Sequence, residues 1–269
     1  MMYASISGWS EEPRRADPAT SKPSNNTILE NDVRDNRINV VFEYSVNGGV
    51  ALSSDNRIFH NNFINGTWNA VTHFGGQSEN FWDDDYPSGG NYWSDYNGTD
   101  ANHDGIGDAP YVIDANNVDH YPLMGMFNSY NVTYYTQPIV PHLCSVTLIS
   151  NSTISDFAAP IWIEHPEIIF LQFNVSGTEG SSGFCRVSFS TAMMNGTYHV
   201  LLNGTEIPYT LLPCSDTNTT YLYFNYTHSE QDVIIIAEFV SFLILPAFLM
   251  TTLLAIATYR KNHSGIFKR

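Results

Sequence analysis

Short apolar triplets separated by asparagines recur near the start of the chain. The pattern of Asn26–Asn31 returns as Asn56–Asn61, and the segments Asn36–Ile38 and Val50–Leu52 lie between the two copies. In a stacked coil, apolar residues point inward onto their neighbours one turn away, and asparagine tolerates left-handed corners between strands. The pattern predicts the end of a right-handed parallel β-helix over residues 25–127, with an asparagine-rich β-meander as the alternative. Such coils need about three repeats to bury a continuous core and about two are present, so we expect further coils upstream.

A different alternation follows in residues 128–232. Apolar and polar residues alternate in the segments CSVTLIS and GFCRVSFS, and the Asn-Gly pair of LLNGTEI lies between two strand-like runs, as in a hairpin turn. Several short strands with turn signals predict an Ig-like β-sandwich. Cys144 and Cys185 fall on its apolar faces, so we expect buried free thiols; the alternative is a disulfide bond that involves Cys214.

The C-terminal region carries a long apolar run. Residues 239–259 contain no charged side chain and, as a helix rising about 1.5 Å per residue, span about 31 Å, the thickness of a bilayer core. We predict a transmembrane helix over 233–259, a basic cytoplasmic tail over 260–269, and the bulk of the chain outside the cell; a buried soluble helix is the alternative. Residues 1–24 are typical of a linker or frayed end. They lack the apolar core of a secretory signal, so we expect an export signal upstream of the given sequence.

The charge balance excludes several classes of protein. The chain has 27 acidic and 11 basic side chains, a formal charge of −16, and no Lys or Arg between Arg57 and Arg186. A nucleic-acid binder needs a basic face and a polyuronide lyase needs cations for its acidic substrate, so neither class fits. Frequent N-x-S/T sequons favour an exported, glycosylated surface. The candidate acceptors are Asn65, Asn97, Asn131, Asn151, Asn174, Asn195, Asn203, Asn218 and Asn225.

Acidic side chains concentrate between Glu79 and Asp119, where ten of them occur without a basic residue, and a hard cation relieves such repulsion. The stretch DANHDGIGD matches D-x-[DN]-x-[DN]-G, in which oxygen ligands converge and glycine allows the sharp turn. We predict a Ca²⁺ site with Tyr111 at the twelfth position instead of a glutamate, so that Asp114 or Asp119 supplies that ligand. The alternative is an Asp/Gly-rich turn that holds its own backbone by hydrogen bonds. The expected ligands are Asp100, Asn102, Asp104, Asp108 and the carbonyl oxygen of Ile106.

Aromatic side chains lie beside these carboxylates. Such rings stack on sugar faces in carbohydrate clefts, and they also plug the open end of a coil, which is the role we expect here. The candidate rings are Trp82, Tyr86, Tyr92 and Trp93. In a glycoside hydrolase, Asp83 and Asp95 would be the candidate carboxyl pair.

Soft metal ligands are also present in this region. Histidine and methionine are ligands that copper accepts, although their loose spacing here is more typical of packing and surface residues. The candidates for copper are His103, His120, Met124 and Met126.

These segments together resemble a known family. NRIFHNNFING and FWDDDYPSGGNYWSDYNGTDANHDGIGDAPYVIDANNVDHYPLM are similar to the C-terminal signature of archaeal NosD-type right-handed parallel β-helix surface proteins, with Asp85 where those proteins usually have glycine. Residues 130–230 resemble the β-sandwich that often follows, and Ala237–Val240 stands in place of a P-E-F-P-like motif before a C-terminal anchor, without its prolines. The resemblance implies a β-helix, a calcium-type loop over Asp100–Asp108, and a link to the copper-insertion factor that gives the family its name.

Enzymes and adhesins share this fold, so the fold alone does not select a function. The residues favour a non-enzymatic, membrane-anchored glycoprotein of the cell surface, with a structural or recognition role toward polysaccharides or envelope proteins. A carbohydrate-active enzyme or lectin and a copper-handling periplasmic factor are the alternatives.

Overall fold

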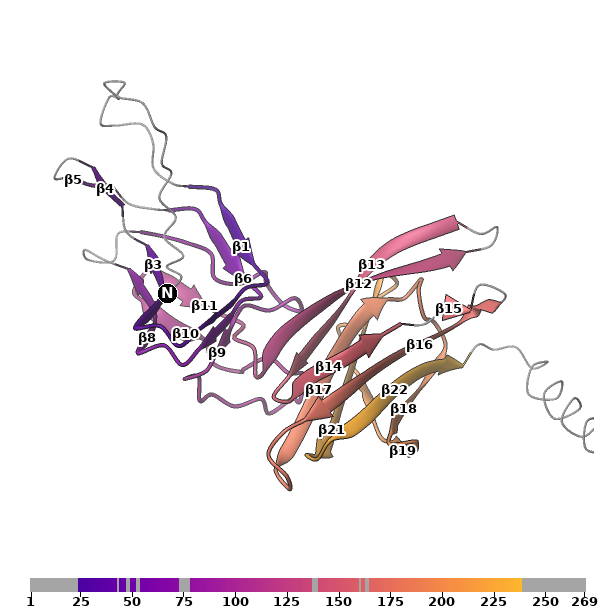
Figure 1. The fold of residues 1–269 in the computed structure, drawn as a ribbon. Helices are drawn as coiled ribbons and strands as arrows, with labels where there is room; N and C mark the ends of the chain where they lie inside the picture. The colour runs from indigo at the N-terminus through magenta and orange to yellow at the C-terminus, as the bar shows by residue number, and fades with distance from the viewer. Residues whose placement is uncertain are drawn as a thin grey trace, which may run out of the picture.

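The computed structural model describes residues 24–238, apart from 43, 47–48, 52–53, 73–77, 137–139, 160 and 163–164. Within these residues the chain is mainly β, as predicted, and contains no α-helix. Figure 1 shows an N-terminal group of strands up to β11 and a C-terminal group from β12 onward. No described segment is a helix long and apolar enough to cross a membrane. The apolar run 239–259, the tail 260–269 and residues 1–23 of the predicted linker lie outside the described residues.

The N-terminal group contains short parallel strands that repeat every 30 residues. Paired residues are 30 positions apart, as are Ile28 and Ile58, and Val33 and Phe63. The predicted repeat is therefore confirmed as two stacked copies. Three parallel sets result: β1 (Thr27–Leu29) with β6 (Arg57–Phe59); β2 (Asp32–Arg34) with β7 (Asn62–Ile64) and β9 (Tyr92–Trp93); and β3 (Ile38–Phe42) with β8 (Trp68–Thr72).

A small apolar core fills the space between these sets. A partial further rung comes from Phe81, which bridges to Arg57 in parallel. The antiparallel hairpin of β10 (Tyr111–Asp114) and β11 (Asn117–Asp119) packs on the core through Tyr111 and Ile113. The buried residues of the core are Val40, Ile58, Phe63, Trp82 and Trp93.

One predicted triplet does not stack. Val50 and Ala51 belong to β5 (Gly49–Ala51), which pairs antiparallel with β4 (Tyr44–Val46). The sequence between the two strands, Asn47-Gly48, is one that favours a tight hairpin turn.

The left-handed corners fall at matching positions of the two copies, but most of them are not asparagines. Positive φ angles occur at Asn25, Glu30 and Asp35 and again 30 residues later at Asp55, His60 and Asn65. The expectation that the asparagines of the repeat form the corners is therefore wrong for Asn26, Asn31, Asn56 and Asn61. Each of these follows a corner, where its amide stacks on the next copy.

The C-terminal group consists of two antiparallel sheets that share one core. One sheet has the order β12 (Met126–Thr136), β13 (Val140–Ser150), β17 (Ser182–Ser190), β21 (Thr219–Thr227), β20 (Thr210–Leu211). The other has the order β14 (Thr153–Ala158), β16 (His165–Ser176), β22 (Gln231–Glu238), β18 (Thr197–Leu202), β19 (Thr205–Ile207), with β15 (Ile161–Trp162) beside β16. Val146, Leu148 and Val187 of the first sheet and Phe173 and Ile235 of the second are buried in the same cluster.

Two sequence expectations in this group are confirmed. The chain reverses at Asn203 and Gly204, which have φ angles of 48° and 76° and join β18 to β19, with Leu202 opposite Thr205. The three cysteines are free thiols and Cys185 is buried as expected, whereas Cys144 is only half-buried.

The predicted domain boundaries need two corrections. Residues 233–238, assigned to the start of a membrane helix, belong to strand β22 and bury Val233 and Ile235 in the sheet core. Over 233–237, buried and half-buried residues alternate, as in a strand. In the sequence this alternation is hard to recognise because a longer apolar run follows directly. The boundary at 127–128 falls inside β12, which begins at Met126.

Candidate functional site

Asparagine side chains stack on one another in the N-terminal group, beside its apolar core. Asn31 donates from its backbone N–H and Nδ2 to Oδ1 of Asn61 (3.2 and 2.9 Å), and Asn61 donates in the same way to Oδ1 of Asn91 (3.1 and 3.0 Å). Asn91 then donates its backbone N–H to Oδ2 of Asp119 at 2.8 Å. Two further ladders run through Asn26, Asn56, Asn80 and Asn117, and through Asn39, Asn69 and Asp95.

Asp119 ends the central ladder as a buried acceptor. It receives hydrogen bonds from the Asn91 backbone, from Nε1 of Trp93 at 2.8 Å and from the Tyr121 backbone at 3.1 Å. Burial nevertheless raises the pKa of its carboxyl to about 7. A carboxylate suits this end because nothing stacks beyond it that needs a donor.

Of the aromatic rings expected to plug the coil, the two tryptophans are buried in the apolar core. Trp82 and Trp93 are each 1% exposed, and Nε1 of Trp82 donates to Oδ1 of Asn117 at 3.1 Å. Because their faces are covered, neither ring is available to a sugar in this structure. Tyr92 is half-buried, whereas Tyr86 is 43% exposed.

The Asp100–Asp108 loop is a tight turn around its own carboxylates. Asp100 accepts hydrogen bonds from the backbone N–H groups of Asp104 and Gly105, both at 2.9 Å, and Asp104 accepts from the N–H of Ile106 at 2.9 Å. His103 and Gly105 have positive φ angles of 55° and 80°, which curl the backbone under Asp100. Burial raises the pKa of Asp100.

The donor set of this loop fits a hard cation in chemistry. It offers the carboxylate, amide and carbonyl oxygens that calcium prefers, and the ring of its one histidine, His103, faces Tyr223. No group of three or more His, Cys, Asp or Glu side chains converges in the described part of the chain, so an ion at this loop would also need amide, backbone or water oxygens. Asp114 bonds Asn117, and Asp119 is occupied by the ladder, so neither joins the loop in this structure.

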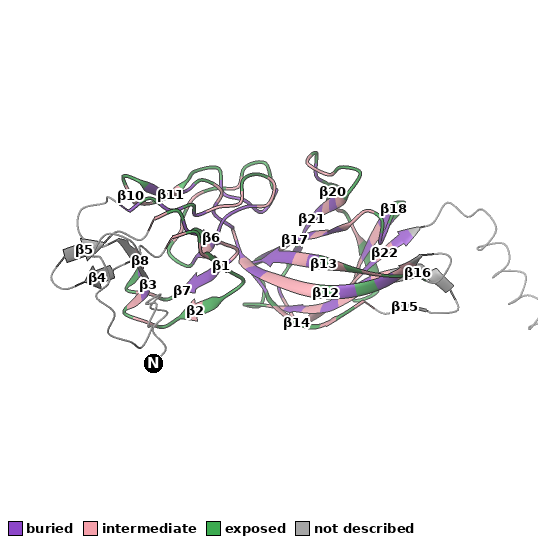
Figure 2. Cartoon of the chain, turned by 90° about the horizontal axis from the view of Figure 1, so that it is seen from above, coloured by how far each residue is buried: buried purple, intermediate pink, exposed green. Residues whose placement is uncertain are grey.

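The loop also docks on the C-terminal group. Ile106 and Leu123 form a buried cluster with Phe127 of β12 and Ile149 of β13. Gly105 lies against the Arg186 side chain, where an added Cβ would be 3.2 Å from its carbons. Figure 2 shows buried strand segments where the two groups meet. A cation in this loop would therefore act on the contact between the groups.

An acidic groove lies on another side of the N-terminal group, whose described residues between 24 and 125 are called the cap below. It has a volume of about 460 Å³, and Phe81, 60% exposed, is on its wall together with Asp55, Glu79, Asp83, Asp85 and His120. Asp83 accepts hydrogen bonds from the backbone N–H of His120 and from its Nδ1, both at 2.9 Å. Asp85 has a φ of 58°, a left-handed backbone conformation that glycine adopts readily.

The alternative catalytic pair is not brought together. Asp83 bonds His120 in the groove, whereas Asp95 accepts from Nδ2 of Asn69 and from the Tyr111 hydroxyl, and does not line the groove. Of the copper candidates, His103 has its ring against Tyr223 at 6.1 Å between centroids, His120 bonds Asp83 through Nδ1, and the Met124 backbone N–H donates to the Gly105 carbonyl at 3.1 Å.

Most candidate glycan acceptors are accessible. Eight of the nine are exposed and Asn174 is half-buried. Asn65, Asn151 and Asn174 already donate their Nδ2 groups to Asp35, to the Ser182 carbonyl and to Asp156.

Sequence reasoning missed two residues at the contact between the groups, His60 and Arg186. Arg186 lies on the outer face of its sheet, where the alternation of inward and outward side chains predicts exposure. The cap covers it, so that it is only 2% exposed. His60 stacks on Phe127, with ring centroids 4.1 Å apart, and burial lowers its pKa. The one sequence feature that set Arg186 apart is that it and Arg57 flank a stretch without any Lys or Arg.

No protein-family model, curated protein or solved structure matches this chain. Its function must therefore be inferred from the residues and their geometry.

Proposed function

We propose that this chain is a non-enzymatic, glycosylated cell-surface protein in which a Ca²⁺-stabilised cap closes the end of a NosD-type right-handed parallel β-helix and fixes it to an Ig-like β-sandwich. The observation that carries the proposal is that the conspicuous polar groups of the cap hold structure together: Asp119 ends a ladder, and Trp82 and Trp93 are buried donors. The parallel pairing at 30-residue intervals supports the β-helix, and the shared core of two antiparallel sheets supports the sandwich.

The calcium part rests on the Asp100–Asp108 loop. Bound there, Ca²⁺ would supply the positive charge that Asp100, Asp104 and Asp108 lack from any nearby Lys or Arg in the sequence. The chain's own residues set the turn through Gly105 and anchor it by burying Ile106 between the two groups.

Thermal unfolding of the full chain tests this part. We expect EDTA to lower the melting temperature of the wild type and excess Ca²⁺ to restore it, because an ion that binds only the folded state stabilises it. Asp104→Ala should melt lower and no longer respond to EDTA. The matched control is Asp216→Ala, since Asp216 also accepts two backbone N–H groups but lies outside the loop. A wild type that ignores EDTA contradicts the calcium proposal.

Membrane attachment through 239–259 and the extracellular placement of the bulk are part of the proposal and rest on the sequence. Enzymatic removal of N-glycans from the native protein should reduce its mass, and Asn195→Gln should remove one glycan's share. A native protein without glycan, recovered from the soluble fraction, contradicts this placement.

The acidic groove supports recognition of polysaccharide as the role of the surface, because an exposed aromatic ring beside carboxylates suits sugar faces and hydroxyls. In a glycan array, Phe81→Ala should lose binding that Leu143→Ala, an exposed apolar residue elsewhere, retains. Binding without turnover that survives Asp83→Ala and Asp95→Ala supports recognition. Turnover of a polysaccharide that either variant abolishes supports a carbohydrate-active enzyme instead.

A further inference from the structure

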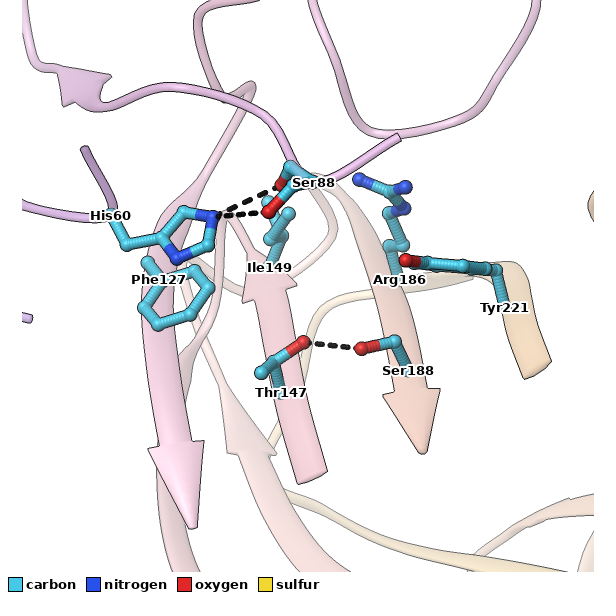
Figure 3. Close-up of a pocket in the computed structure, with 8 residues that line it drawn as sticks. All are labelled: His60, Ser88, Phe127, Thr147, Ile149, Arg186, Ser188 and Tyr221. Atoms are coloured by element: carbon cyan, nitrogen blue, oxygen red, sulfur yellow. Dashed lines mark hydrogen bonds between the residues drawn. The ribbon is translucent and has the colours of Figure 1, made fainter. Parts of the chain in front are cut away.

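A cavity of about 90 Å³ lies where the cap meets the five-stranded sheet. Its wall on the cap side includes His60 and Ser88, and its wall on the sheet side includes Thr147, Arg186 and Tyr221. Figure 3 shows the Arg186 guanidinium pointing toward Ser88 and the hydroxyl pair of Thr147 and Ser188 on the adjacent strands. The cavity is distinct from the acidic groove and from the Asp100–Asp108 loop.

Arg186 carries a buried charge without an acidic partner. It is 2% exposed, and among the described residues no carboxylate forms an ion pair with it. Its Nη2 donates to the Pro87 carbonyl at 2.6 Å and its guanidinium lies 4.8 Å from the Tyr221 ring centroid, but its buried Nε has no hydrogen-bond partner. Asp84, the acidic residue of the adjoining loop, is already paired with Arg57 and Ser88.

A buried guanidinium without an acidic partner lowers the stability of the folded state unless a bound group neutralises its charge. A buried charge is normally paired, and a buried N–H without an acceptor costs about 1–3 kcal/mol. The other cavity groups are mainly donors or neutral. The Thr147 and Ser188 hydroxyls bond each other at 2.5 Å, which uses one of their two protons, and the Tyr221 hydroxyl adds another donor.

The remaining residues that line the cavity carry no negative charge that would repel an anion. His60 bonds the Ser88 carbonyl through Nε2 at 3.1 Å, and burial lowers its pKa, which disfavours its charged form. Phe127 and Ile149 supply apolar walls. The cavity volume of about 90 Å³ is about three times that of one water molecule, which is about 30 Å³.

We infer that this cavity is a binding site for a small oxyanion, a sulfate or carboxylate group held by Arg186 Nε with the Tyr221 and Thr147–Ser188 hydroxyls. All of these partners belong to the sheet, and His60 and Ser88 of the cap line the same cavity, so the ligand would lie where the cap meets the sheet. This site requires neither calcium nor the sugar-binding groove.

Calorimetric titration of the full chain tests the site. The probes are sodium sulfate and sodium glucuronate at constant ionic strength, with glucose as the uncharged control. We expect at least one of the anions to bind saturably at one site per chain, and no binding of glucose. A response to sulfate alone identifies a free inorganic anion as the ligand, and a response to glucuronate identifies the acid group of a sugar.

Variants separate a specific site from a general salt effect. Arg186→Gln should weaken anion binding at least tenfold, whereas Arg34→Gln, which removes an exposed arginine paired with Asp32, should leave it unchanged. If Arg186→Gln fails to fold, Tyr221→Phe and Ser188→Ala keep the charge and should each weaken binding about fivefold to tenfold. Absence of saturable binding, or equal binding in these variants and the wild type, overturns the inference.

Discussion

Asp119 shows how one residue can close a repetitive interior. Every upstream member of its ladder is an asparagine that donates to the next member, and Asn61 and Asn91 also accept from the member before. At the last position only acceptors are needed, and a carboxylate supplies them to Asn91, Trp93 and Tyr121. From sequence, Asp119 was a possible metal ligand; its role in the ladder depends on stacking that only the 30-residue register reveals.

The raised pKa of Asp119 predicts an unusual pH dependence. With a folded pKa of about 7 against 3.8 for the free group, the folded chain binds more protons than the unfolded chain between these values. Its contribution therefore makes the protein less stable as pH rises from about 4 to about 7, by up to about 1.4 kcal/mol per pH unit.

Denaturant unfolding of wild type and Asp119→Asn across this pH range measures the contribution. The difference in unfolding free energy between the two should change with pH, whereas the exposed-site control Asp156→Asn should track the wild type. Parallel pH profiles for Asp119→Asn and wild type contradict the assigned pKa direction.

At the scale of elements, the repeat was the most predictable feature. The spacing of Asn26–Asn31 and Asn56–Asn61 predicted the register of β1 on β6, since stacking requires equivalent residues to coincide. The hairpin at Asn203-Gly204 was equally readable, because few dipeptides adopt two positive φ angles. The identity of the corner residues was not, because Glu30 and His60 occupy left-handed positions without the usual sequence signal.

The ladder predicts a large cost for removing a single amide. Asn61 is fully buried; it bonds the carbonyls of Ile28 and Phe59 and accepts from Asn31. Asn61→Ala leaves these groups unsatisfied, and we expect a loss of about 2–3 kcal/mol in unfolding free energy. Chemical denaturation measures this, with the exposed Asn195→Ala as control. A loss no larger than that of the control contradicts a structural role for the ladder.

At the scale of the whole molecule, the contact between the two groups was beyond sequence reasoning. Ile106 was expected to offer its carbonyl to a metal, but its side chain proves to be part of the cluster with Phe127 and Ile149. Arg186 and His60 become buried only because the cap lies over the sheet. Such burial comes from tertiary docking and leaves no periodic trace in the sequence.

The docked cap predicts that a core substitution at Ile106 separates the groups. Ile106→Ala should lower the free energy of unfolding by about 2–5 kcal/mol through lost apolar contact. It should also expose the cap to limited proteolysis before the antiparallel sheets are cut. Val112→Ala, at an exposed apolar residue of the cap, is the control and should change neither. A proteolysis pattern identical to that of the wild type contradicts the role of Ile106 in docking.

We propose that the Asp100–Asp108 loop binds calcium and thereby secures the cap. Calorimetric titration of Ca²⁺ into the metal-stripped full chain measures this binding. We predict saturable binding of one ion per chain in the wild type and no saturable binding in Asp100→Ala, while the control Asp216→Ala binds as the wild type does. Absence of saturable binding in the wild type, or equal binding in Asp100→Ala, contradicts the claim.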